Sequence, residues 1–113
     1  MTNFGVVILT MGSRPNELRK AIDSVLNQVN VDTNIVVVGN GWEPVDLPNG
    51  VAALALPENI GIPAGRNAGV SRVNGEILFF LDDDAELPDS HFLERMVALL
   101  DTRPEIGLVQ PRV

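Results

Sequence analysis

The sequence predicts an α/β domain with a mostly parallel sheet of about five strands flanked by helices. Short unbroken apolar runs, such as residues 77–81, are typical of strands that are buried on both faces. Segments with helical periodicity separate these runs, and strands that alternate with helices form parallel sheets through right-handed crossovers. We therefore expect residues 1–113 to form a single domain.

The first half of the chain is predicted to contain two strands and one helix. Residues 5–10 and 34–38 are β-branched runs that are typical of strands. Between them, Ser13 is expected to cap a helix that has Pro15 in its first turn. This helix should end near Asn30, and its apolar stripe consists of Leu18, Ala21, Ile22, Val25 and Leu26.

The second half is predicted to contain three strands and two helices. The glycine-rich residues 39–41 should end the second strand, and a weak third strand follows at 51–56. A helix should begin near Pro63, before the strand at 77–81. A last strand is expected at 106–109, after a helix whose apolar face carries Phe92, Leu93, Met96, Val97 and Leu100.

Three consecutive carboxylates, Asp82, Asp83 and Asp84, follow the strand at 77–81. Uncompensated buried charge is costly, so these side chains must lie where the strand leaves the sheet. Ligands bind at the carboxyl ends of strands in open α/β sheets, and hard oxygen ligands suit Mg²⁺ or Mn²⁺. A solvated loop or a helix start is the alternative explanation. The position directly after a buried strand favours a metal that holds an anionic group.

A second informative stretch has glycines at four-residue intervals, Gly61, Gly65 and Gly69. Glycine costs a helix roughly 1 kcal/mol relative to alanine, so something is expected to approach this backbone closely. An anionic ligand at the helix N-terminus, beside Arg66, is the interpretation that we favour. The alternative is tight helix–strand packing, with Arg66 as an ordinary surface residue.

Composition excludes several classes of function. A net charge of −7 argues against binding to nucleic acid. The sequence has no cysteine and a single histidine, His91, which excludes a thiolate site and a multi-histidine zinc site. We expect His91 to be a surface or capping residue. With no signal-like opening and no apolar stretch of about 20 residues, we expect a soluble cytoplasmic protein without a transmembrane segment.

These motifs together resemble the donor-binding half of family 2 glycosyltransferases, which have the GT-A fold. The resemblance covers nearly the whole chain and is carried by residues 6–28 with Arg14, by 59–69 and by 75–84. It implies binding of a nucleoside-diphosphate sugar. It also implies transfer of the sugar to an acceptor hydroxyl by a metal-assisted inverting displacement.

The resemblance further implies a role for each matching position. Asp84 would ligate Mn²⁺ or Mg²⁺ together with Asp82, in the place of the family's DXD motif. Thr10 would contact the nucleotide base, and Asp82 or Asp83 would hold ribose or metal-bound water. The complete donor-binding set would be Thr10, Arg14, Asn40, Arg66, Asp82 and Asp83.

Two positions depart from the family pattern. The second strand is usually followed by an acidic pair, one of which reads uracil, and this chain has Gly39 and Asn40 there. Asn40 retains the capacity to hydrogen-bond a base, with different donor and acceptor options. The residue after Thr10 is often aromatic, whereas here it is Met11, whose thioether can cover a base edge.

The family fold needs roughly twice this length. We therefore expect a donor- and metal-binding half that is inactive alone, with the acceptor site and the general base beyond Val113. An exposed sheet edge would then favour self-association. The sugar, the nucleotide base and the acceptor stay open.

Two other functions stay open as well. A Toprim-like phosphoryl enzyme also has Asp-x-Asp after a strand, but it requires a glutamate just after the first strand, and residues 10–13 contain no acid. A non-catalytic nucleotide-binding module is the other alternative, because the sequence alone does not separate it from a truncated enzyme.

Overall fold

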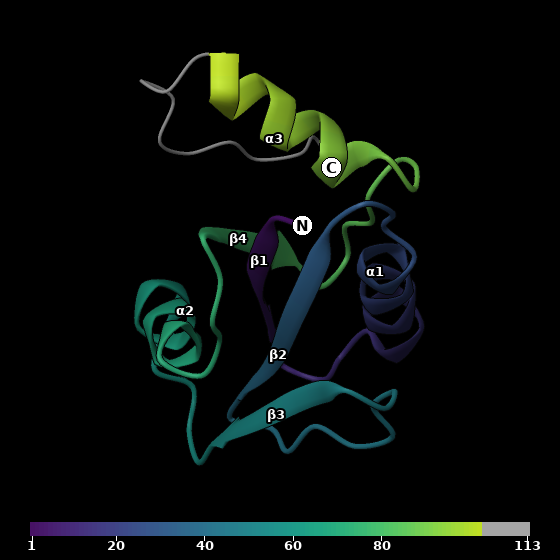
Figure 1. Cartoon of the computed structure of the whole chain (residues 1–113). Helices are drawn as coiled ribbons and strands as arrows, with labels where there is room; N and C mark the ends of the chain where they lie inside the picture. Colours follow the sequence, from purple (N-terminus) through teal and green to yellow (C-terminus); the bar gives the residue numbers. More distant parts are fainter. Residues whose placement is uncertain (103–113) are drawn as a thin grey trace.

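The computed structural model describes residues 1–102 of the chain (Figure 1). In chain order the elements are β1 (Asn3–Thr10), α1 (Pro15–Leu26), β2 (Asp32–Asn40), β3 (Val51–Leu56), α2 (Ile62–Val70), β4 (Ile77–Asp82) and α3 (Phe92–Thr102). The strands form one parallel sheet in the order β3-β2-β1-β4. The predicted α/β class and parallel sheet are confirmed, with four strands in the described part. The strand predicted at 106–109 lies outside the described residues.

The sheet is covered on both faces, with α1 and α2 on opposite sides (Figure 1). Successive strand residues point to opposite faces, which divides each apolar run between two clusters. The larger cluster joins the sheet to α1 and α3, and its members include Val6, Ile8, Ile35, Val37, Phe79, Leu81, Leu18, Ile22, Val25 and Leu93. The smaller cluster, on the α2 side, has the buried residues Val7, Val36 and Val38. The sheet is thus buried on both sides, as the unbroken apolar runs predict.

The glycines of α2 serve packing. Gly65 and Gly69 are buried against the sheet. A Cβ on Gly69 would lie 2.6 Å from Cγ1 of Val7, and one on Gly65 would lie 2.7 Å from Cδ1 of Leu9. Gly61 does not share this face, because it is the exposed N-cap residue of α2, with φ +87°. The close approach expected at Gly65 and Gly69 is made by the sheet's own side chains, which is the packing alternative, and the anionic ligand expected at the helix N-terminus stays a prediction.

Three element boundaries differ from the predictions. The N-cap residue of α1 is Arg14 rather than Ser13, and no side chain caps this helix. The helix ends at Leu26, before the predicted Asn30. Strand β2 continues through Gly39 and Asn40, because these residues pair with β1 and β3, and the chain turns at Gly41 with φ +76°.

Polar side chains join α3 to the end of α1. Gln28 donates to the carbonyl of Asp89 at 2.6 Å and accepts from the N–H of Leu93 at 2.9 Å. His91 is exposed and contacts Glu94, as expected for a surface residue. Within residues 1–102, no helix has the length and apolar character needed to cross a membrane.

Candidate functional site

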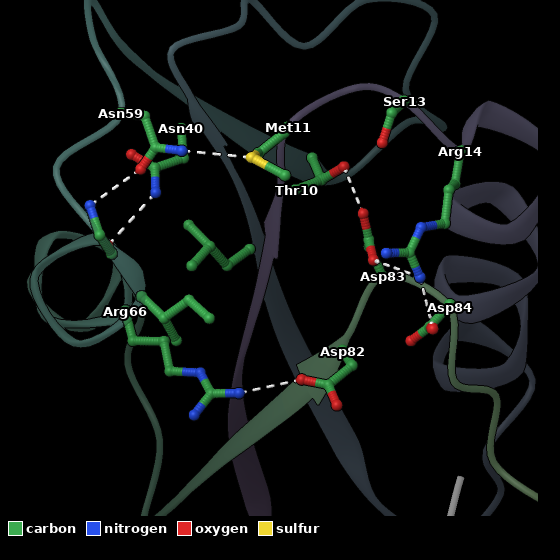
Figure 2. A pocket seen from close by; sticks show the side chains of 13 residues that line it. Thr10, Met11, Ser13, Arg14, Asn40, Asn59, Arg66, Asp82, Asp83 and Asp84 are labelled. Carbon is green, nitrogen blue, oxygen red and sulfur yellow. Dashed lines mark hydrogen bonds and ion pairs between the residues drawn. The ribbon is translucent and has the colours of Figure 1, made fainter.

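A cavity of about 670 Å³ lies at the carboxyl ends of the strands. The register places Thr10 beside Gly39 and Leu9 beside Asp82, so the ends of β1, β2 and β4 meet at this edge. The lining residues are Leu9, Thr10, Met11, Ser13, Arg14, Asn40, Asn59, Gly61, Ile62, Arg66, Asp82, Asp83 and Asp84. Every donor- or metal-binding residue predicted from the sequence is among them (Figure 2).

Each of the three aspartates has its own partner (Figure 2). Asp82 accepts a hydrogen bond from Nη2 of Arg66 at 2.9 Å. Asp83 accepts from the hydroxyl of Thr10 at 2.8 Å. Asp84 forms an ion pair with Nη1 of Arg14, which also lies 3.9 Å from Asp83. The carboxylates are thus balanced by two guanidinium groups that reach the cavity from different elements.

The backbone explains why the aspartates divide in this way. Asp82 is the last residue of β4 and follows Leu81, which faces the α1 side, so Asp82 points to the α2 side where Arg66 lies. Arg66 is also positioned by Phe80, because its guanidinium carbon lies 5.7 Å from the ring centroid. Asp83 and Asp84 then occupy a turn that is closed by the N–H of Ala85 donating to the carbonyl of Asp82 at 3.1 Å.

Thr10 orients the loop and one carboxylate at the same time. It is 2% exposed, and its hydroxyl accepts the N–H of Gly12 at 3.0 Å while it donates to Asp83. The indole of Trp42 packs directly over Gly12, which has φ +80°, and leaves no room there for a side chain. Sequence reasoning missed Trp42, for which the signal was the chain's single tryptophan inside a proline-containing loop.

Asn40 fastens the loop that leads into α2. It is 4% exposed, its Oδ1 accepts the N–H of Ile60 at 2.9 Å, and its Nδ2 donates to the carbonyl of Gly61 at 3.2 Å. A Cβ on Gly39 would overlap the carbonyl oxygen of Trp42, so a larger residue there would displace this loop. These contacts explain in structural terms why glycine and asparagine occupy positions 39 and 40. The role of Asn40 toward a nucleotide base stays a prediction.

Met11 and Ile62 form an apolar side of the cavity, and the amide of Asn59 lies beside Met11. Nδ2 of Asn59 lies 3.2 Å from the sulfur of Met11, and its Oδ1 accepts the N–H of Gly61 at 2.9 Å. Met11 and Ile62 are both more than half exposed. Sequence reasoning placed Asn59 in a motif but gave it no role, because its partner is distant in the chain. The cavity therefore has a charged side at the end of β4 and an apolar side near the start of α2.

The carboxylates fit a metal ion that is shared with a ligand. Within residues 1–102, no three acidic or histidine side chains come together as a complete metal cage. Mg²⁺ is commonly held by one or two carboxylates together with substrate phosphates and water, rather than by protein alone. Asp82 and Asp84 have side chains that are 51% and 37% exposed, and both line the cavity. Their hard oxygen atoms suit such a shared cation.

A sequence comparison matches residues 6–113 to the family described as Glycosyl transferase family 2. The chain belongs to glycosyl transferase family 2. A curated relative in this comparison is the O-antigen biosynthesis protein RfbC from Myxococcus xanthus, which is 28% identical over 112 residues. The match covers 91% of this chain and 9% of RfbC.

Solved structures share the fold of this family 2 chain. One is S. aureus TarS 1-349 in complex with UDP-GlcNAc, with a TM-score of 0.67 at 19% identity, covering 90% of this chain and 32% of that one. Another is the mannosyltransferase PcManGT from Pyrobaculum calidifontis in complex with GDP-Man and Mn²⁺, with a TM-score of 0.69 at 18% identity. That match covers 86% of this chain and 32% of PcManGT. The chain thus spans about a third of the length of these structures.

Proposed function

We propose that this chain supplies the donor site of a glycosyltransferase that uses a nucleoside-diphosphate sugar. The observation that carries the proposal is the cavity at the strand ends, where three aspartates and two arginines of a family 2 chain converge. Ligands of the structural neighbours support it, since TarS has been solved with UDP-GlcNAc and PcManGT with GDP-Man and Mn²⁺.

The two sides of the cavity suit the two ends of such a donor. The nucleoside would lie on the apolar side, beside Met11 and Ile62. The diphosphate would lie on the charged side, where Arg14 and Arg66 offer guanidinium donors that match phosphate oxygens. Asp82 and Asp84 would hold a Mn²⁺ or Mg²⁺ ion, which neutralises charge on the leaving diphosphate when it is bound.

The reaction that we propose is an inverting displacement. The oxygen of an acceptor hydroxyl forms a bond to the anomeric carbon as the bond from that carbon to the diphosphate oxygen breaks. The hydroxyl proton passes to a general base, for which we assign no residue of the described part of the chain. The residues of this chain bind and orient the diphosphate, and Thr10 contributes by fixing Asp83 through its hydroxyl.

Calorimetric titration with UDP, GDP, ADP and dTDP tests the proposal. We expect binding in Mn²⁺ and none in EDTA. In Asp84→Ala the affinity in Mn²⁺ should fall by at least about tenfold, because a charge-assisted interaction is lost.

Asp23→Ala is the matched control, because it removes the same charge from an exposed pair with Arg19 outside the cavity. It should bind like the wild-type chain. Unchanged affinity in Asp84→Ala would contradict the metal role of Asp84, and absence of binding in the wild-type chain would contradict the donor site.

A further inference from the structure

Arg14 holds a carboxylate that the proposed function, on which this inference rests, assigns to a cation. Its Nη1 donates to Oδ2 of Asp84 and lies 3.9 Å from Oδ1 of Asp83. A guanidinium between two carboxylates supplies positive charge where a divalent cation would supply it. A cation that ligates this oxygen of Asp84 has to take it from Arg14. The two positive groups therefore compete for one carboxylate.

The two arginines of the cavity are held differently. Arg66 projects from α2, its guanidinium lies over the ring of Phe80, and its side chain is 31% exposed. Arg14 is the N-cap residue in the loop before α1, and its side chain is 47% exposed. Both ion pairs are partly exposed and contribute little, but Arg66 would also have to leave the ring of Phe80, so Arg14 exchanges partners at lower cost.

A diphosphate offers Arg14 another partner in the same cavity. Phosphate oxygens accept paired hydrogen bonds from the guanidinium fork, and they carry more negative charge than one carboxylate. When Arg14 turns to the diphosphate, the oxygen of Asp84 becomes accessible to the cation. The guanidinium charge that leaves Asp84 is then replaced by the charge of the cation.

We propose that Arg14 couples cation binding to diphosphate binding by screening Asp84 until a diphosphate accepts its hydrogen bonds. Linkage makes this coupling reciprocal, so the diphosphate raises the affinity for the cation by the same factor as the cation raises the affinity for the diphosphate. Direct ligation of the cation by phosphate also couples the two ligands. The contribution of Arg14 is the part that disappears when its charge is removed.

The test is a Mn²⁺ titration of the 113-residue chain, followed by water proton relaxation, with and without UDP or GDP. In Arg14→Met the affinity for Mn²⁺ alone should rise about fivefold, the factor expected from loss of a competing exposed ion pair. The enhancement of Mn²⁺ binding by the nucleotide should fall by a similar factor. Arg14→Lys keeps the charge and should bind Mn²⁺ alone about as weakly as the wild-type chain.

Arg19→Met is the matched control, since it removes one exposed arginine that pairs with Asp23 at 3.2 Å. It removes one positive charge, as Arg14→Met does, and should leave both affinities unchanged. If Arg14→Met binds Mn²⁺ alone no more tightly than Arg19→Met does, the proposed screening is overturned. Absence of Mn²⁺-dependent nucleotide binding in the wild-type chain is a separate result. That result would overturn the proposed function. The two failures can be told apart because the screening by Arg14 is tested with Mn²⁺ alone, in the absence of nucleotide.

Discussion

The two faces of the sheet carry their helices in opposite ways. On one face, α1 packs through branched side chains such as Ile22 and Val25. On the other, α2 packs through Gly65 and Gly69, which have no side chains. The close approach of α2 brings Arg66 to the end of β4, whereas the α1 side reaches the cavity through Ser13 and Arg14 in the loop before that helix. The α1 face thus gains stability from buried side-chain volume. On the other face, the absence of side chains at Gly65 and Gly69 lets α2 lie close to the sheet and so positions Arg66.

Removal of volume on the α1 side should have the largest effect. Ile22 is 1% exposed in the main cluster, so Ile22→Ala leaves a cavity that the sheet and α3 fill only in part. We expect the free energy of unfolding to fall by about 2–5 kcal/mol in urea titrations. Lys20→Ala, on the exposed side of the same helix, is the control and should change little. A loss below about 1 kcal/mol in Ile22→Ala would contradict this view of the α1 face.

Addition of volume on the α2 side should have the next largest effect. The new Cβ of Gly69→Ala would lie 2.6 Å from Val7 and 2.8 Å from Val38, and both neighbours are β-branched and buried. Overpacking costs about 1–3 kcal/mol, which outweighs the gain of about 1 kcal/mol in helix propensity. The two effects together predict a net loss of up to about 2 kcal/mol, measured in the same titrations.

The sign of this change decides between two explanations of the glycine. If Gly69→Ala stabilises the chain, as it would in an unpacked helix, close packing of α2 is wrong. Asn67→Ala, which is exposed on the same helix, controls for propensity.

The smallest effect is expected at the start of α3, which belongs to the α1 side. Hydrogen bonds from Arg95 and from the N–H of His91 hold the pKa of Asp89 below its usual value of 3.8. A carboxyl whose folded pKa is lowered stabilises the fold at pH values above 3.8, and the contribution is lost as the pH falls through the lowered pKa. Melting temperatures of the wild-type chain and Asp89→Asn should therefore differ slightly at neutral pH and converge in acid. A difference that persists unchanged in strong acid would contradict this assignment.

The sequence predicted the fold and the three aspartates at the edge of the cavity because both follow from local patterns. Unbroken apolar runs located the strands, and the rule for ligands at strand ends brought Asp82, Asp83 and Asp84 to the correct edge. The reason for the glycines was not decided by the sequence, since the spacing of Gly65 and Gly69 fits a ligand or a neighbouring strand equally well. Only the positions of Val7 and Leu9 distinguish these explanations, and they depend on tertiary packing.

The partners of the polar side chains were also beyond sequence reasoning. Asn40 and Ile60 are 20 positions apart, and Thr10 and Asp83 are 73 apart. No periodicity relates residues at such separations. Arg14 and Arg66 were correctly expected in the cavity, but their pairing with Asp84 and Asp82 depends on which side of the sheet each carboxylate faces.

The division of the aspartates between the two faces has a consequence for how the cavity can diverge among homologous chains. Asp82 pairs with a residue of α2, and Asp84 pairs with a residue of the loop before α1. A substitution in one of these segments therefore changes the partner of one carboxylate. The arginine partners of Asp82 and Asp84 can therefore change independently, although the two carboxylates are two positions apart in the sequence. Among homologous chains, the contacts of one arginine–aspartate pair with a ligand can therefore change while the other pair keeps its contacts.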